Sequence, residues 1–213
     1  MALLKDIHYR QLDVAVWCAT AYIVHTQSKD QLLNNKMRGI DYGKTKRQIQ
    51  REGVRSLLQN LLVHLNITDS LDDSMFPYRL NLNHYYVCFS HSKDKVAVVI
   101  SAKKTAGIDI EINNISWQVA RRFYHSDEIE MLGTLSDVQY RQASKSLWQL
   151  KESFIKIENS SLAKGLGVSY SYLIPQLIDA LTDRSRQSVR FIETNILNYK
   201  VALLTSEETL IVF

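Results

Sequence analysis

Two acidic side chains stand two residues apart in the segment 107–113, which reads GIDIEIN. Its alternating isoleucines predict a β-strand, on which Asp109 and Glu111 would project from one face about 7 Å apart. Neighbouring carboxylates repel each other, and burying them unpaired is costly. A cation must therefore compensate them. Mg²⁺, which prefers carboxylate oxygens, and a Lys or Arg side chain are both open interpretations of this segment alone.

A third carboxylate, Glu152, lies in the segment 148–156, WQLKESFIK. This segment belongs to a long helix predicted over residues 137–159, in which Glu152 and Lys156 lie on one face at i, i+4 spacing. A surface ion pair is one interpretation. The aromatic residues of the segment indicate that the helix is partly packed, and then Glu152 could join the other carboxylates, with Lys151 and Lys156 beside it as phosphate ligands.

A third polar cluster, Ser90-His91-Ser92, follows the apolar run of residues 85–89. A second apolar run, residues 96–101, comes after a short polar turn, and the two runs together predict a β-hairpin. A single histidine is more often structural than catalytic. Here it lies between two hydroxyl groups at the end of a strand, where these three side chains could contact a phosphate.

The remaining sequence predicts an α+β protein with two similar halves, residues 1–104 and 105–213. Each half contains a long helix and several strands, and the polar turn at residues 103–106 is the natural midpoint. Helices are expected at residues 29–38, 44–65 and 137–159. Strands are expected at residues 12–24, 168–172, 189–191, 199–204 and 210–213.

The composition favours an anionic partner. The chain of 213 residues carries a formal net charge of +4, a bias that suits nucleic acid, phosphorylated small molecules or acidic proteins. Its two cysteines, Cys18 and Cys88, are isolated, which indicates a reducing compartment without a disulfide framework. No early apolar run has the length of a signal peptide core or a membrane span. We therefore expect a cytoplasmic protein without a membrane partner.

Taken together, the blocks FSHS, GIDIE and WxxKESFxK, in this order, resemble the 4′-phosphopantetheinyl transferases. The greatest similarity is to the single-chain, surfactin-synthetase-activating class. The resemblance is strong over residues 89–156 and continues weakly through the KGL turn at residues 164–166 and the strand 199–204. Three separate blocks in one order make a chance match improbable, whereas each block alone would be a weak signal.

The resemblance implies two α+β halves related by a pseudo-twofold axis, with coenzyme A in the cleft between them. Asp109 and Glu111 would hold Mg²⁺, which Mn²⁺ could replace. Glu152 would be the third metal ligand or the catalytic base. Lys156 would contact the phosphate that is attacked, and Lys151 the neighbouring phosphates.

The nucleotide part of coenzyme A has its own expected contacts. By the same resemblance, Ser90 and His91 would bind the 3′-phosphate. A basic group in the first half would bind the adenylate, and the corresponding residues are Lys46 and Arg47, with Lys36 and Arg38 as weaker candidates.

The implied reaction converts an apo carrier protein to its holo form. A serine hydroxyl of an acyl, peptidyl or aryl carrier protein attacks the β-phosphorus of coenzyme A, and 3′,5′-ADP leaves. Coenzyme A and the typically acidic carrier proteins both suit the basic charge of the chain. A monomer is expected, because two fused halves supply the cleft.

Three other functions compete with this interpretation. The basic helix at residues 44–55 could bind nucleic acid, but this would leave the three carboxylates unexplained. A metal-dependent nuclease or phosphatase would use the acids without needing the Ser-His-Ser block. A degenerate scaffold protein is the last alternative, although all candidate carboxylates and lysines are present. The transferase alone would consume coenzyme A only in the presence of a carrier protein, and no nucleic-acid partner is expected for it.

Overall fold

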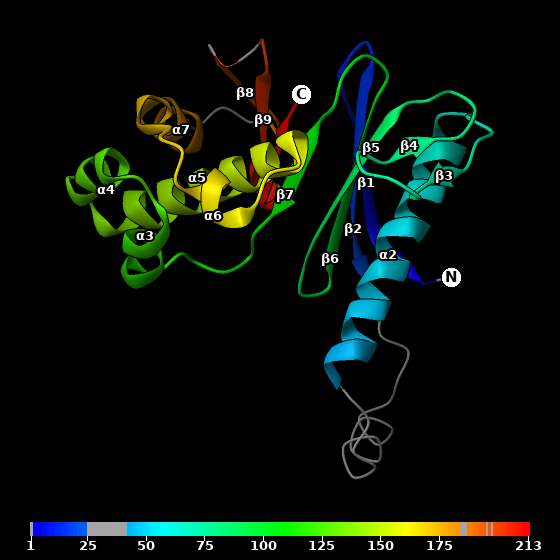
Figure 1. Ribbon diagram of the computed structural model, residues 1–213, viewed down its shortest axis with the longest axis horizontal. Helices are drawn as coiled ribbons and strands as arrows, with labels where there is room; N and C mark the ends of the chain where they lie inside the picture. Colours follow the sequence, from blue (N-terminus) through cyan, green and yellow to red (C-terminus); the bar gives the residue numbers. More distant parts are fainter. Residues whose placement is uncertain (1, 25–41, 184–186, 195, 197) are drawn as a thin grey trace.

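The computed structural model describes residues 2–24, 42–183, 187–194, 196 and 198–213. The protein is a mixed α+β structure with two antiparallel sheets, and helices lie on the outer side of each sheet (Figure 1). The expected helix at residues 29–38, with Lys36 and Arg38, falls outside the described residues. Among the residues that are described, no helix is long and apolar enough to cross a membrane.

The first sheet has six strands in the order β1-β2-β6-β5-β4-β3. Its outer face is covered by the long helix α2 (Tyr42–His64), whose leucines pack on alternate residues of the central strands. The strands are β1 (Leu4–Asp13), β2 (Val16–Ile23), β3 (Leu71–Asp72), β4 (Arg79–Leu80), β5 (Tyr86–Ser92) and β6 (Lys95–Ser101).

The second sheet has four strands in the order β7-β10-β9-β8. The long helix α5 (Asp137–Glu158) crosses its outer face, and shorter helices complete that layer. The strands are β7 (Gly107–Ile110), β8 (Arg190–Glu193), β9 (Lys200–Leu204) and β10 (Thr209–Val212). The short helices are α3 (Trp117–Phe123), α4 (Ser126–Gly133), α6 (Leu162–Leu166), η1 (Ser171–Leu173), α7 (Ile174–Thr182) and η2 (Thr205–Glu207).

The inner faces of the two sheets pack on each other and give four layers, α/β/β/α (Figure 1). On β6, Val96 and Val98 face α2, whereas Ala97 and Val99 face the second sheet. Because this strand is buried on both faces, its sequence is an almost continuous apolar run rather than an alternating one. The two sheets are joined by the linker of residues 102–106, and residue 104, the expected end of the first half, lies within it.

Several sequence predictions are confirmed, with informative exceptions. The helices expected at 44–65 and 137–159 are α2 and α5, and the expected hairpin is β5–β6. The strand expected at residues 168–172 is wrong, because this segment leads through η1 into α7, which has a proline in its first turn. Leu173, Ile174 and Leu177 pack there with helical spacing, and this packing overrides the local alternation.

Candidate functional site

The carboxylate of Asp109 lies where the two sheets and helix α5 meet. Lys156 Nζ, on α5, donates to Asp109 Oδ1 at 2.9 Å and to the carbonyl oxygen of Ile108 at 2.7 Å. Ser90 Oγ, on β5, donates to the same carboxylate oxygen at 2.9 Å. The three blocks that the sequence singled out, residues 90–92, 109–111 and 152–156, therefore meet through the side chains of Asp109, Ser90 and Lys156.

The two serines of the Ser-His-Ser block connect the sheets. β7 is the edge strand of its sheet, so some of its backbone N–H groups lack a strand partner. Ser90 Oγ accepts from the N–H of Ile110, the last residue of β7, at 3.1 Å, and Ser92 Oγ accepts from the N–H of Ile112, two residues beyond the strand, at 3.4 Å. These hydroxyls complete backbone hydrogen bonding that an adjacent strand would otherwise provide.

This arrangement corrects the expected role of Ser90. Its side chain is buried, and its hydroxyl both donates to Asp109 and accepts from Ile110, so it is a structural contact rather than a free phosphate ligand. His91 points the other way, because side chains alternate along a strand, and it is exposed. His91 remains available to a ligand at the same point of the fold.

Asp109, Glu111 and Glu152 lie close enough together for the charges of the first two to raise the pKa of the third. β7 ends at Ile110, so Glu111 lies just beyond the strand, where its Oε1 accepts from the N–H of Asn113 at 2.7 Å. Burial raises the pKa of Glu152; Lys156 opposes this, and the charges of Asp109 and Glu111 add to the increase. Three carboxylates therefore share one local field.

Lys156 is the cation that pairs with Asp109 and lies near Glu152. Burial lowers its pKa, but the attraction of Asp109 and Glu152 outweighs burial, and the net pKa is raised. The ammonium group therefore remains charged next to Asp109. Within the described ranges, no group of three or more His, Cys, Asp or Glu side chains is arranged to hold a metal ion.

The donor chemistry nevertheless fits a hard divalent cation. Burial is the main cause of the raised pKa of Glu152, and the charges of Asp109 and Glu111 add to it, so a cation beside these three carboxylates would lower the cost of ionising them. Mg²⁺ binds through one or two carboxylates and keeps water or phosphate oxygens at its other positions. Asp109, Glu111 and Glu152 are the residues that could hold it.

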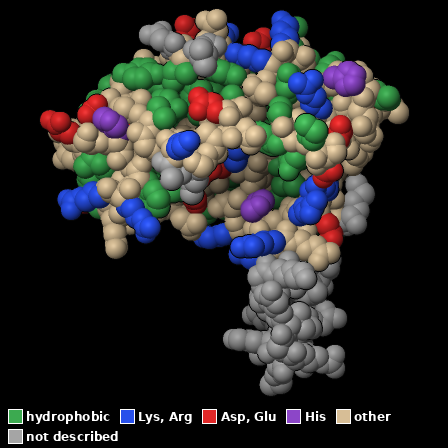
Figure 2. Space-filling view, viewed as in Figure 1, with side chains coloured by type: hydrophobic (Ala, Val, Ile, Leu, Met, Phe, Trp, Pro, Cys, Tyr) green, Lys and Arg blue, Asp and Glu red, His purple; other side chains and the backbone are tan. Residues whose placement is uncertain are grey.

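A basic group lies beside the carboxylates. Although His91 is exposed at the surface, partial desolvation by neighbouring atoms lowers its pKa, and the charges of Lys156 and Lys46 lower it further, while Asp109 opposes them. Lys46 and Arg47 are exposed near the start of α2. Figure 2 shows basic side chains gathered at the lower part of this face, where α2 begins in Figure 1. Lys46 and Lys156 are therefore both near enough to His91 to affect its pKa, and Arg47 follows Lys46 in the sequence.

Lys151 is not part of the site, which corrects the expectation that it contacts phosphate. Its side chain is completely buried, and its Nζ pairs with Glu128 Oε2 at 2.8 Å and donates to the carbonyl oxygen of Leu166 at 2.7 Å. The rings of Tyr124 and Tyr170 lie on it, each 5.3 Å from Nζ. A buried charge with these partners holds α4, α5 and the segment after α6 together.

Two positioning residues were missed by the sequence reasoning. Gln149 Nε2 donates to the carbonyl oxygens of Asp109, at 3.4 Å, and Glu208, at 2.5 Å, and so fixes β7 against α5. Gly107 lies so close to α5 that an added Cβ would be 2.1 Å from the carbonyl oxygen of Ser153. The small residues Gly107 and Ser153 were the only available signal, because close approach of a strand and a helix requires them.

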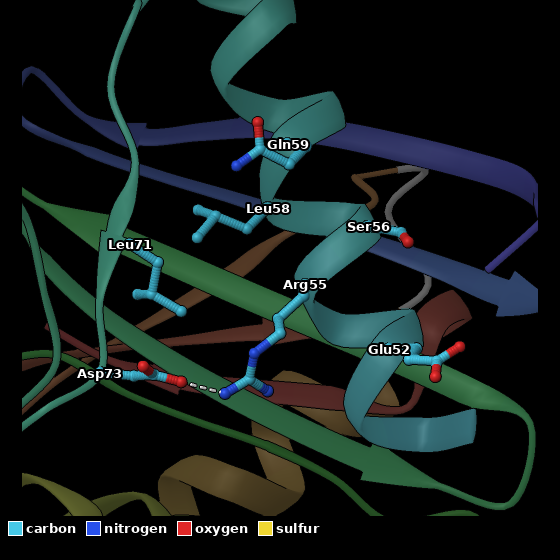
Figure 3. Close-up of a pocket in the computed structure, with 7 residues that line it drawn as sticks. All are labelled: Glu52, Arg55, Ser56, Leu58, Gln59, Leu71 and Asp73. Carbon is cyan, nitrogen blue, oxygen red and sulfur yellow. Dashed lines mark hydrogen bonds and ion pairs between the residues drawn. The ribbon is translucent and has the colours of Figure 1, made fainter. Parts of the chain in front are cut away.

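A separate shallow pocket of about 380 Å³ lies between α2 and the segment that contains β3 (Figure 3). Arg55 reaches from α2 across this pocket to pair with Asp73. Glu52 and Ser56 also line it, from the same helix. None of the candidate residues derived from the sequence lines this pocket, and its ion pair already satisfies its main charges.

No protein-family model matches the chain, and the comparison with curated proteins finds no match either.

Proposed function

We propose that this protein transfers the 4′-phosphopantetheine group of coenzyme A to a serine of a carrier protein. The observation that carries the proposal is the contact of Lys156 and Ser90 with Asp109, which brings together three blocks that are far apart in the sequence. The two sheet-and-helix units are compatible with the pseudo-twofold fold that the resemblance implies. In this proposal the protein acts as a monomer.

Asp109, Glu111 and Glu152 would hold Mg²⁺ or Mn²⁺. When bound, such an ion neutralises charge on a pyrophosphate and on its leaving group. The chain supplies the remaining positive charge. Lys156 stays protonated beside Asp109 and can donate to the phosphate under attack, and His91, Lys46 and Arg47 can meet the nucleotide phosphates.

Glu152 is the proposed base. A raised pKa brings a carboxylate nearer to the pH at which it can both remain ionised and accept a proton. It would take the proton of the carrier serine as the serine oxygen bonds to the β-phosphorus. The bond from that phosphorus to the bridging oxygen breaks, and 3′,5′-ADP leaves with the electron pair.

Intact mass spectrometry tests this function. An apo acyl carrier protein and an apo peptidyl carrier domain are each incubated with the protein, coenzyme A and Mg²⁺, with and without EDTA. A gain of about 340 Da, the mass of one phosphopantetheine group moved by phosphoryl transfer, is expected only with metal. The isosteric variant Asp109→Asn should lose this gain and keep its circular dichroism spectrum.

The other outcomes are equally informative. No mass gain on either carrier, together with no heat of binding for coenzyme A, would refute the proposal. Cleavage of coenzyme A without a carrier protein would indicate a phosphoesterase instead.

A further inference from the structure

A small pocket lies at the end of the inter-sheet layer that is away from Asp109. It encloses about 90 Å³ where the β1–β2 turn, the β6–β7 linker and the start of β9 meet. Ser101, on β6, lines it and is four residues along that strand from Ala97, which is opposite Ser90. Four residues of strand span about 13 Å, so this pocket is separate from the candidate active site.

The pocket is lined by a buried hydroxyl group, that of Ser101, which lacks a hydrogen-bond partner within the part of the chain that the structure describes. Its side chain is fully buried, and Ser101 Oγ has no hydrogen-bond partner among the described residues. Buried hydroxyl groups are almost always hydrogen-bonded, because leaving one unpaired costs about 1–3 kcal/mol. The hydroxyl can donate to an acceptor that enters the pocket.

The charge of the lining favours an anion. Lys103, Lys104 and Lys200 line the pocket, against one carboxylate, Asp13. Lys104 is partly engaged, since its Nζ donates to the carbonyl oxygen of Asn198 at 2.8 Å. Asp13 Oδ1 accepts from the backbone of the β1–β2 turn. Lys103 and Lys200 are exposed, and they leave a positive excess at the mouth of the pocket.

We propose that this pocket binds one small tetrahedral oxyanion, such as inorganic phosphate or the phosphate group of an ester. Its volume corresponds to about three water molecules, which suits a single tetrahedral ion and excludes a whole nucleotide. Ser101 would donate to one oxygen, with Lys103 and Lys200 around the others. Because Ser101 belongs to the first sheet and Lys200 to the second, the anion would join the two sheets.

Thermal unfolding in a zwitterionic buffer at constant ionic strength tests the site. Inorganic phosphate, replacing chloride, should raise the Tm of the full chain with the logarithmic dependence on concentration that is expected for a ligand of the native state. Ser101→Ala and Lys200→Ala should each lower the phosphate affinity obtained from this Tm dependence about tenfold, the loss expected for one hydrogen bond to a charged group. Lys164→Ala, at an exposed lysine on α6, is the matched control and should retain the full effect.

The buffer without phosphate adds an independent readout. Without phosphate, the Tm of Ser101→Ala should be equal to or higher than that of the parent chain, because the substitution removes an unpaired buried hydroxyl. With phosphate, the Tm of Ser101→Ala should be the lower of the two. A parallel titration with phenyl phosphate separates the two sources. A similar shift indicates that esters enter the pocket, and a shift with phosphate alone indicates the free ion.

Three results would overturn the proposal. The first is an equal phosphate effect in the parent chain, Ser101→Ala and Lys200→Ala. The second is loss of the effect in Lys156→Ala, which would place the anion at the candidate active site. The third is no increase in Tm with the logarithm of the phosphate concentration. None of these results depends on transferase activity, so the two proposals fail separately.

Discussion

Asp109 receives hydrogen bonds from side chains of both layers that flank β7. Ser90 comes from the first sheet and Lys156 from helix α5, and both reach the same carboxylate oxygen. A carboxylate is a poor choice for a strand on propensity alone. At this position it links a sheet, a helix and the neighbouring acids, so its place in the fold and its proposed role in binding a cation are inseparable.

Glu152 provides a test of the charge balance at the single-residue level. Its pKa is raised above the ordinary value of 4.5, so the folded state holds the proton more tightly than the unfolded state. Stability should therefore fall as the pH rises from that ordinary value through the folded pKa. Glu152→Gln removes this loss and should have a higher Tm than the parent at pH 7, with a difference that shrinks toward pH 4.

Adding Mg²⁺ provides a second test of the role of Glu152. It should raise the Tm of the parent at pH 7 and have a smaller effect on Glu152→Gln, measured by calorimetry in EDTA and in excess metal. A Tm of Glu152→Gln below that of the parent at pH 7 would show that the ionised carboxylate stabilises the fold, contrary to its raised pKa.

At the level of elements, the buried Glu128–Lys151 pair decides how α4 is held against α5. Glu128 accepts from Lys151 and from the backbone N–H groups of His125 and Tyr170. Glu128→Gln leaves the Lys151 charge buried without a full counter-charge. The free energy of unfolding should fall by about 3–5 kcal/mol, the usual cost of breaking such a pair from one side. Urea denaturation measures it.

Glu130→Gln, at an exposed position of the same helix, is the control and should change stability by less than about 0.5 kcal/mol. The double variant Glu128→Leu/Lys151→Met replaces both charges with apolar groups and should recover much of the loss. Equal stability of Glu128→Gln and the parent would contradict the structural role assigned to Lys151.

The close approach of β7 and α5 makes a second prediction at this level. Gly107→Ala places a methyl group 2.1 Å from the carbonyl oxygen of Ser153, so backbone must move and stability should fall by about 1–3 kcal/mol or more. Gly133→Ala is the matched substitution, because nothing lies within 4 Å of its added Cβ. Chemical denaturation of the two variants in parallel should separate them clearly.

The sequence predicted elements better than it predicted what individual side chains do. Long helices and apolar strands follow from spacing that each segment carries by itself. The mistaken strand at residues 168–172 shows the limit, since a short alternation can also precede a helix. Lys151 was misassigned because its burial depends on Glu128, a residue of another helix. The role of Ser90 depends on the free edge of β7, which no local pattern reveals.

At the scale of the whole molecule, the proposed site depends on how the two sheets are held together. Ser90→Ala removes one donor and one acceptor at their junction, and should lower the free energy of unfolding by about 1–3 kcal/mol. Turnover should fall with it, because Asp109 loses a positioning contact. Affinity for coenzyme A should change little.

His91→Ala is the adjacent comparison. This exposed side chain does not connect the sheets, so its loss should leave stability within about 0.5 kcal/mol and should raise the KM for coenzyme A. Denaturation and steady-state kinetics on both variants separate a structural contact from a ligand contact. The reversed pattern, with His91→Ala unfolding the protein and Ser90→Ala raising only the KM, would refute both assignments.

The serine hydroxyls that cover β7 also have a consequence for self-association. An edge strand with free N–H groups can recruit a strand from another molecule and start aggregation. Ser90 and Ser92 occupy the N–H groups of Ile110 and Ile112, next to the apolar inner faces of both sheets. The side chains that bring the acidic cluster together therefore also block intermolecular strand pairing at this edge, and chains that lack both hydroxyls should precipitate at lower concentration than the parent.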